Sequence, residues 1–357
     1  MTNSIDAIYM VEASPTLRIA QKNLLCGEDA PMTESKVGYH SVCKSTSIPI
    51  VWTETIKSIP ISAEKMPFIV AHEFFDALPI HTFQCVEVPP TQDAPPKEKD
   101  NSSPSTKTSE PTLQWREMLV SATPPGSTHE SLGTPPSQSR HTPPPDFQMT
   151  LAKTPTRHSL YLPESSPRYR GIKAQTGDGA LIEVCPDAAL HAADFAARIG
   201  GSAQHPKGKP SGAALLLDYG PGDGSVPTNS LRGIKAHRRV SPFAEPGLTD
   251  LSADVDFAGI VEAGVRASEG IEVHGPVEQG PFLEAMGIRQ RAEMLLKAAA
   301  ARGGGEGSKA AADIEKSWKR LVDRGPDGMG RLYKALAILP ENDGKRLPVG
   351  FGGDVAA

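Results

Sequence analysis

The stretch that decides the fold is Phe68-Ile-Val-Ala-His-Glu-Phe-Phe-Asp-Ala-Leu-Pro79. Its first four residues form a short apolar run of the kind that a fully buried parallel strand has. The run then changes abruptly to the ionisable residues His72, Glu73 and Asp76. In an open α/β sheet, ligands bind just outside the carboxyl ends of the strands. The stretch therefore predicts an α/β fold with candidate reactive groups at the edge of its sheet.

The same residues also have a simpler, structural interpretation. Acidic side chains are favoured at the starts of helices and turns. In that case Asp76 caps a turn and Glu73 is solvated. The spacing alone does not choose between the two interpretations.

Two other predicted strands end in an acidic residue. The segment 8–11 is apolar and ends at Glu12, and the N-cap Ser14 and Pro15 then begin a helix. A carboxylate in this place can accept hydrogen bonds from both hydroxyls of a ribose. The buried strand predicted at 213–217 ends at Asp218, which we expect to face the cleft. Because the carboxyl ends of parallel strands share one sheet edge, Glu12 and Asp218 are candidate ligand-binding residues.

Composition bounds the class of protein. The chain has 357 residues and a net charge of −5, which gives no reason to expect a partner made of nucleic acid. It has no run of about 18 apolar residues, so no membrane span is predicted. The four cysteines are widely scattered and include no CxxC pair, which argues against a zinc site and against a disulfide-built fold.

A second search for a metal site gives the same result. Asp250, Asp254 and Asp256 lie close together, but they lack the loop spacing and distal Glu of a calcium site. They fit the start of a helix with capping acids better. We therefore expect no metal in this protein.

Proline content divides the chain. Sixteen of the 34 prolines lie between Pro89 and Pro167, mixed with Ser and Thr, which makes a continuous fold there improbable. Alternating segments at 115–120 and 147–152 predict short strands within this insertion. We expect a small antiparallel meander whose turns carry disordered inserts at about 89–112 and 122–146. The predicted organisation is a core at 1–88, the insertion at 89–179, the rest of the core at 180–340, and an exposed tail at 341–357.

The C-terminal part shows one strong amphipathic pattern. Apolar residues at helical spacing predict a single helix over 281–297. The Gly- and Ala-rich segment around 298–312 is expected to fray or to form a loop.

Several blocks of this sequence resemble the MidA-type methyltransferases. The blocks occur in the order typical of that family and cover nearly the whole chain outside the proline-rich inserts. They are Val11-Glu-Ala-Ser-Pro-x-Leu17, Ala71-His-Glu-Phe-Phe-Asp-Ala-Leu-Pro79, Trp115-Arg-Glu117, Glu183-Val-Cys-Pro-Asp-Ala188, Leu217-Asp-Tyr-Gly220, Leu231-Arg-Gly233, Gly247-x-Thr-Asp-Leu-Ser-Ala-Asp-Val-Asp-Phe257 and Gln279-Gly-Pro-Phe-Leu-x-x-Met-Gly-Ile288.

The resemblance implies a class I, Rossmann-type fold with a mostly parallel sheet that binds S-adenosylmethionine (SAM). The family includes a mitochondrial protein arginine methyltransferase that is needed for assembly of respiratory complex I. The implied function is symmetric dimethylation of an arginine in a complex I subunit, in the mitochondrial matrix. A homodimer is a further candidate assembly.

Site roles combine the resemblance with position in the chain. Glu73 is the candidate that orients the substrate guanidinium, with His72 beside it as a positioning or proton-accepting group. Asp76 would orient the loop or share the guanidinium. Glu12 would hold the SAM ribose, and Asp218 would line the substrate side of the cleft.

In this family, a strand and a Gly-rich loop precede the ribose-binding acid. Glu12 lies close to Met1, so we expect that strand and loop, and the transit peptide, to be absent from this chain. Such a chain would bind SAM poorly. An alternative function is therefore a non-catalytic assembly or binding protein on a methyltransferase scaffold. A third is a SAM-fold enzyme that acts on a small molecule.

Overall fold

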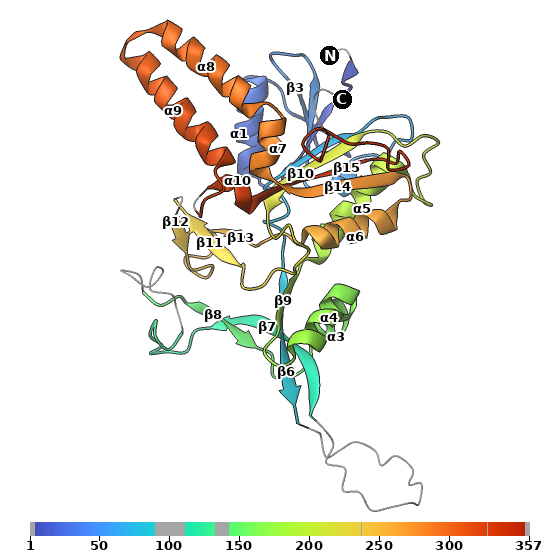
Figure 1. The fold of residues 1–357 in the computed structure, drawn as a ribbon, viewed down its shortest axis with the longest axis vertical. Coiled ribbons are helices and arrows are strands. Elements are labelled where there is room, and N and C mark those ends of the chain that lie inside the picture. Colours follow the sequence, from blue (N-terminus) through green and yellow to red (C-terminus); the bar gives the residue numbers. More distant parts are fainter. Residues whose placement is uncertain (1–3, 90–110, 133–142, 237, 327, 354–357) are drawn as a thin grey trace, which may run out of the picture. The chain divides into compact units, whose positions relative to one another are not determined.

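The computed structural model describes residues 4–89, 111–132, 143–236, 238–326 and 328–353 (Figure 1). They belong to two compact units, residues 1–64 and residues 65–357. Residues 90–110, which are most of the first predicted proline-rich insert, and residues 133–142 of the second lie outside the described residues. Within the described part, no helix is long and apolar enough to cross a membrane.

The first unit is a four-stranded sheet with one long helix. The strand order is β1-β4-β3-β2, with β1 parallel to β4 and the other pairs antiparallel. Trp52 on β4 is fully buried and forms a core with Ile50, Cys26 and Cys43. The elements are β1 (Ile8–Val11), α1 (Pro15–Cys26), β2 (Thr33–Glu34), β3 (Tyr39–Val42), β4 (Pro49–Thr53) and η2 (Ile56–Ser58).

The second unit is built on a mixed sheet of order β14-β15-β10-β5. The strand predicted at the opening stretch is β5 (Phe68–His72), which runs parallel to β10 (Ala213–Tyr219). The full burial expected for it is wrong, because β5 is an edge strand and Phe68 and Val70 are mostly exposed. The last strand, β15 (Tyr333–Pro340), is antiparallel to both β10 and β14 (Ile271–Glu278). This pairing brings the carboxyl ends of β5 and β10 together beside the beginning of β15.

Two helices cover the apolar strands of this sheet. The amphipathic helices α5 (Pro186–Gly200) and α6 (Phe257–Ala267) pack on each other and against β15 and β14 (Figure 1). Ile199 and Ile260 on the helices are almost completely buried, as are Leu216 and Leu336 on the strands. Burying such side chains contributes roughly 1.5–3 kcal/mol each, so the edge that carries the site rests on a rigid core.

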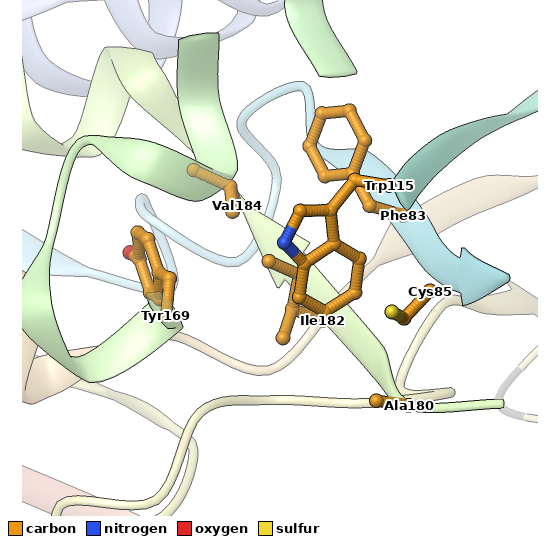
Figure 2. Close-up of a cluster of buried hydrophobic side chains, with 7 residues drawn as sticks. All are labelled: Phe83, Cys85, Trp115, Tyr169, Ala180, Ile182 and Val184. Carbon is orange, nitrogen blue, oxygen red and sulfur yellow. The ribbon is translucent and has the colours of Figure 1, made fainter. Parts of the chain in front are cut away.

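The expected antiparallel meander has the strand order β8-β7-β6-β9, in which β7 and β8 of the predicted insertion join β6 and β9 from the segments that flank it. Its strands are β6 (His81–Val88), β7 (Thr112–Ala122), β8 (Phe147–Leu151) and β9 (Leu181–Val184). Figure 2 shows its core, where the indole of Trp115 lies among Phe83, Cys85 and Ile182. The short helices α3 (Arg157–Tyr161), η3 (Leu162–Glu164) and α4 (Pro167–Thr176) follow β8, and Tyr169 of α4 joins the same core.

The single helix expected over 281–297 is wrong. The segment forms α7 (Gln279–Ala285) and α8 (Ile288–Arg302), separated at Gly287, whose φ of +84° is left-handed. A glycine adopts that conformation without steric cost, so the chain turns there. The expected loop at 298–312 is also wrong, because α9 (Gly304–Val322) forms an antiparallel hairpin with α8 (Figure 1).

The remaining elements complete the second unit. They are α10 (Met329–Leu332) and the small sheet β12-β11-β13, formed by β12 (Arg238–Val240), β11 (Arg232–Lys235) and β13 (Asp250–Ser252). The combination of helices and mixed sheets confirms the predicted α/β class. The mostly parallel sheet that was expected is wrong for the described strands, because most of their pairs, including those of β15 with β10 and β14, are antiparallel.

Candidate active site

The turn after β5 is held in a strained backbone conformation. Glu73 has a φ of +48°, and its N–H donates to the carbonyl of Leu217 at 3.0 Å. A non-glycine residue in the left-handed region costs about 1–3 kcal/mol and is often found at functional sites. The left-handed conformation of Glu73 turns the chain sharply at the sheet edge. Residues 73–76 form the resulting turn at the end of β10, which we call the elbow.

Asp218 holds this elbow from below. Its Oδ2 accepts hydrogen bonds from the backbone N–H groups of Phe74, Phe75 and Asp76, at 3.1, 2.9 and 3.3 Å. Its Oδ1 accepts from the N–H of Tyr219 at 2.9 Å. The side chain is completely buried. The sequence predicted an Asp218 that faces the cleft; in the structure both of its oxygens are turned onto the backbone of the elbow.

The acidic groups around the elbow influence each other. Burial, and next the charge of Asp76, raise the pKa of Asp218 from 3.8 to about 7. Burial also raises the pKa of Asp76, and the charge of Glu73 adds to that effect. Since like charges close together disfavour ionisation, the three carboxyl groups form one electrostatic unit.

Glu73 is anchored by a tyrosine at the start of β15. The hydroxyl of Tyr333 donates to Glu73 Oε1 at 2.6 Å, and it also contacts the hydroxyl of Tyr219. The two tyrosine rings lie 4.0 Å apart between centroids. Burial and the hydrogen bond to Glu73 raise the pKa of Tyr333 above its ordinary value, so its hydroxyl remains a donor at neutral pH.

The free face of Glu73 is available to a ligand. Its side chain is 47% exposed, and Oε2 makes no hydrogen bond to any of the described residues. His72, the last residue of β5, is 56% exposed, with its Nε2 at 3.9 Å from Glu73 Oε1. The structure therefore brings His72, Glu73, Asp76 and Asp218 together at one sheet edge.

A cavity of about 860 Å³ lies beside Tyr219. The guanidinium of Arg232 lies over the Tyr219 ring, 5.1 Å from its centroid, and pairs with Asp254 at 2.5 Å. The cavity has more basic than acidic side chains in its lining, which favours an anionic ligand. The charged residues that line it are Asp223, Arg232, Arg238, Arg239, Asp254, Arg331 and Lys334.

Gly220 lets a second chain segment approach this edge. The N–H of Val255 donates to the carbonyl of Tyr219 at 2.9 Å. A Cβ on Gly220 would lie only 2.3 Å from the carbonyl oxygen of Val255. The first glycine of the Gly-rich tract, Gly220, therefore serves to let the segment at Val255 pack closely against the end of β10.

Glu12 belongs to the first unit, at the end of the parallel strand β1. It lies in a different sheet from Asp218, so the single sheet edge expected for the two residues is wrong. Its Oε1 accepts from the N–H of Ser14 at 2.9 Å, and its Oε2 accepts from Gln21 Nε2 at 3.1 Å. Gln21 in turn accepts from the indole N–H of Trp52 at 3.0 Å. A half-buried carboxylate at a strand-to-helix turn offers the acceptor oxygens that ribose hydroxyls require.

Sequence reasoning missed Tyr219, Tyr333 and Arg232 as site residues. Tyr219 could have been found from its place directly after Asp218. Tyr333 carries no local signal, because 260 residues separate it from Glu73. Only the pairing of β15 with β10 brings the two together.

Comparison with known proteins identifies the family. A family model described as "Putative S-adenosyl-L-methionine-dependent methyltransferase" matches residues 2–277. The chain belongs to this methyltransferase family, which confirms the resemblance predicted from its sequence blocks.

The curated relatives carry a more specific name. The chain is 31% identical over 354 residues to "Protein arginine methyltransferase NDUFAF7, mitochondrial" of Rattus norvegicus, with 98% of this chain and 62% of the relative covered. It is 28% identical over 334 residues to the protein of that name in Danio rerio, with 93% and 61% covered. The chain thus spans about three fifths of the length of these relatives.

A solved structure supports the fold. The chain resembles a likely methyl transferase of the COG1565 superfamily from Burkholderia thailandensis that was solved with S-adenosyl-homocysteine. The TM-score is 0.56 at 18% identity, and the match covers 98% of this chain and 66% of that one. At this identity the likeness shows a shared fold.

Proposed function

We propose that this chain is a SAM-dependent protein arginine methyltransferase that acts in the mitochondrial matrix on a complex I subunit. The names of its relatives support arginine as the acceptor and the mitochondrion as the location. The observation that carries the mechanism is the half-exposed Glu73 carboxylate, which Tyr333 fixes at the carboxyl end of β5.

The proposed cofactor has a plausible ligand in Glu12. This carboxylate ends a parallel strand directly before a helix and would accept hydrogen bonds from the ribose hydroxyls. When bound, SAM supplies a methyl group on a positively charged sulfur, which is the electrophile of the reaction.

Glu73 would act on the acceptor arginine. The guanidinium is delocalised and always protonated, and it is therefore a poor nucleophile. A carboxylate that accepts from two of its N–H groups orients it, offsets its charge and favours electron density at the reacting nitrogen. Positioning of this kind can contribute roughly 7–11 kcal/mol. Since Tyr333 occupies Oε1, the free Oε2 is the oxygen that faces the substrate.

The other residues have supporting roles in this mechanism. The acceptor nitrogen would have to lose a proton on methylation, and His72 or Glu73 would accept it. Asp218 would act as a positioning residue, because it holds the elbow without an exposed atom. Asp76 would keep the elbow negative toward the guanidinium.

The protein substrate is also constrained by charge. The basic lining of the cavity beside Tyr219 would repel a guanidinium and attract an acidic segment. This supports a target arginine at Glu73 with acidic residues a few positions away along the substrate chain.

The test uses this chain with methyl-labelled SAM and a mitochondrial extract from cells that lack the endogenous protein. The proposal expects calorimetric binding of SAM, in contrast to the poor binding expected if the Gly-rich loop is absent. It also expects label in one protein of complex I, and symmetric dimethylarginine at the labelled position by mass spectrometry. Binding of SAM without protein labelling would instead support a small-molecule methyltransferase. The absence of both would support a non-catalytic assembly protein.

A further inference from the structure

Three metal-ligating side chains meet in the meander, away from the elbow. They are His81 at the start of β6, Glu117 on β7 and His158 on α3, and one ligand atom of each lies within 4.8 Å of the other two. No short motif connects them, because 36 and 41 residues separate the histidines from Glu117. The cluster therefore has no signature in the sequence.

Strand pairing creates the cluster. Phe83 of β6 pairs with Glu117 of β7. His81, two residues earlier, lies on the same face of the sheet because side chains alternate along a strand. His158 is added by α3, whose N-cap Thr156 places the helix beside β7. The ligands thus come from three elements of one compact fold.

The distances suit a divalent transition ion. Glu117 Oε1 lies 2.7 Å from His81 Nδ1 and 3.4 Å from His158 Nδ1. Two ligands of a tetrahedral zinc ion lie about 3.3 Å apart, given metal–ligand bonds of about 2.0–2.2 Å. Admitting the ion would therefore require His81 Nδ1 and Glu117 Oε1 to move apart by about 0.6 Å. Two imidazoles and one carboxylate are a ligand set that zinc commonly has.

Neighbouring groups hold the ligands in place. The hydroxyl of Thr156 donates to Glu117 Oε2, which leaves Oε1 to face both imidazoles. The ring of His81 stacks on Phe83 with an interplanar angle of 11°. Contacts from neighbouring residues that orient the ligand side chains are typical of metal sites. The Glu117 side chain is only 7% exposed, whereas His158 is 53% exposed, so an ion can enter from the His158 side.

We propose that His81, Glu117 and His158 bind a divalent transition-metal ion of the zinc type. The ion would tie α3 to the meander and keep one coordination position open to water. In its absence, His81 hydrogen-bonds to Glu117 Oε1, and His158 Nδ1 lies 3.4 Å from the same oxygen. Zinc binding by these residues can be measured without any assay of methyl transfer.

The experiment titrates Zn²⁺ into the metal-free chain by calorimetry and follows thermal unfolding. We expect one zinc ion per chain and a higher unfolding temperature. The H81A and H158A variants should lose at least tenfold in zinc affinity, whereas H205A, which alters an exposed histidine elsewhere, should bind as the wild type does. The proposal would be overturned if the wild type bound less than one tenth of an equivalent of zinc, or if H81A and H158A bound zinc as tightly as the wild type does.

A second measurement uses only the wild type, so it remains informative if H81A or H158A fails to fold. Co²⁺ added to the wild-type chain should give visible absorption of a low-coordinate site without a thiolate charge-transfer band, because the proposed ligands are nitrogen and oxygen. A thiolate band would place the ion on cysteine and would contradict the assignment.

Discussion

The hydroxyl of Tyr333 donates a 2.6 Å hydrogen bond to Glu73 Oε1 across 260 residues of sequence. This bond joins the first residue of the last strand to the first residue of the elbow. It fixes one oxygen of the carboxylate and leaves the other open. The orientation of Glu73 therefore depends on the correct pairing of β15 with β10.

Replacing Tyr333 with Phe tests this bond. A hydrogen bond to a carboxylate contributes about 1.5–3 kcal/mol, and the partial exposure of Glu73 places the effect near the lower limit. We expect Y333F to reduce methyl transfer about tenfold with little change in SAM affinity. Y161F, which removes the hydroxyl of an exposed tyrosine, is the matched control. Equal activity of the two variants would show that the bond has no role in catalysis.

The buried Asp218 carboxyl group, which accepts hydrogen bonds from the elbow, predicts that the free energy of unfolding depends on pH. Its pKa is about 7 in the folded chain, whereas an ordinary Asp has 3.8. Between these values the folded state holds a proton that the unfolded state has lost. The contribution of Asp218 is thus fully present below about pH 4 and is lost as the pH rises to about 7. At about 1.4 kcal/mol per pH unit, the change is on the order of 4 kcal/mol.

Urea unfolding of the wild type and of D218N at a series of pH values measures this effect. The wild type should lose stability from pH 4 to pH 7, and D218N should show a flatter profile. Asp76 contributes with the same sign, because its pKa is also raised. Parallel profiles for the two chains would mean that Asp218 is ionised throughout this range.

The meander core predicts a large cost for removing Trp115. Its side chain is 4% exposed and packs among the other apolar side chains of Figure 2. Truncation of a buried Trp to Ala typically costs 3–5 kcal/mol because it leaves a cavity. W115A should lower the free energy of unfolding by about that amount, whereas V120A, at an exposed position of the same strand, should change it by less than about 0.5 kcal/mol. A small effect of W115A would mean that the meander is not cooperatively folded.

The close packing at Gly220, two residues after Asp218, predicts a steric cost for any larger side chain there. An alanine there would place its Cβ against the carbonyl oxygen of Val255. We expect G220A to destabilise the chain by about 1–3 kcal/mol, since the backbone must move. Gly208, which has open space around it and no positive φ, supplies the control G208A. Equal unfolding midpoints for the two variants would show that the turn adapts freely.

The sequence predicted the elements whose signals are local. The apolar runs before Glu12, Glu73 and Asp218 form parallel strands, and each acidic residue lies at a strand end. The alternating segments of the insertion form β7 and β8, since a period of two reflects one buried face.

Long-range and conformational features could not be predicted in this way. Asp218 has the same local signal whether it faces a cleft or accepts hydrogen bonds from a turn 142 residues away. The bond from Tyr333 to Glu73 depends on sheet topology. The break at Gly287 was missed because the apolar period continues through it, while a single left-handed residue changes the direction of the chain.

The central claim is that Glu73 orients the acceptor arginine. Glu73→Gln keeps the shape of the side chain but removes the charge, so it is the most direct test. We expect E73Q to bind SAM with unchanged affinity by calorimetry and to lose at least a hundredfold in methylation of the labelled protein substrate. Methylation by E73Q at the wild-type rate would remove Glu73 from the mechanism.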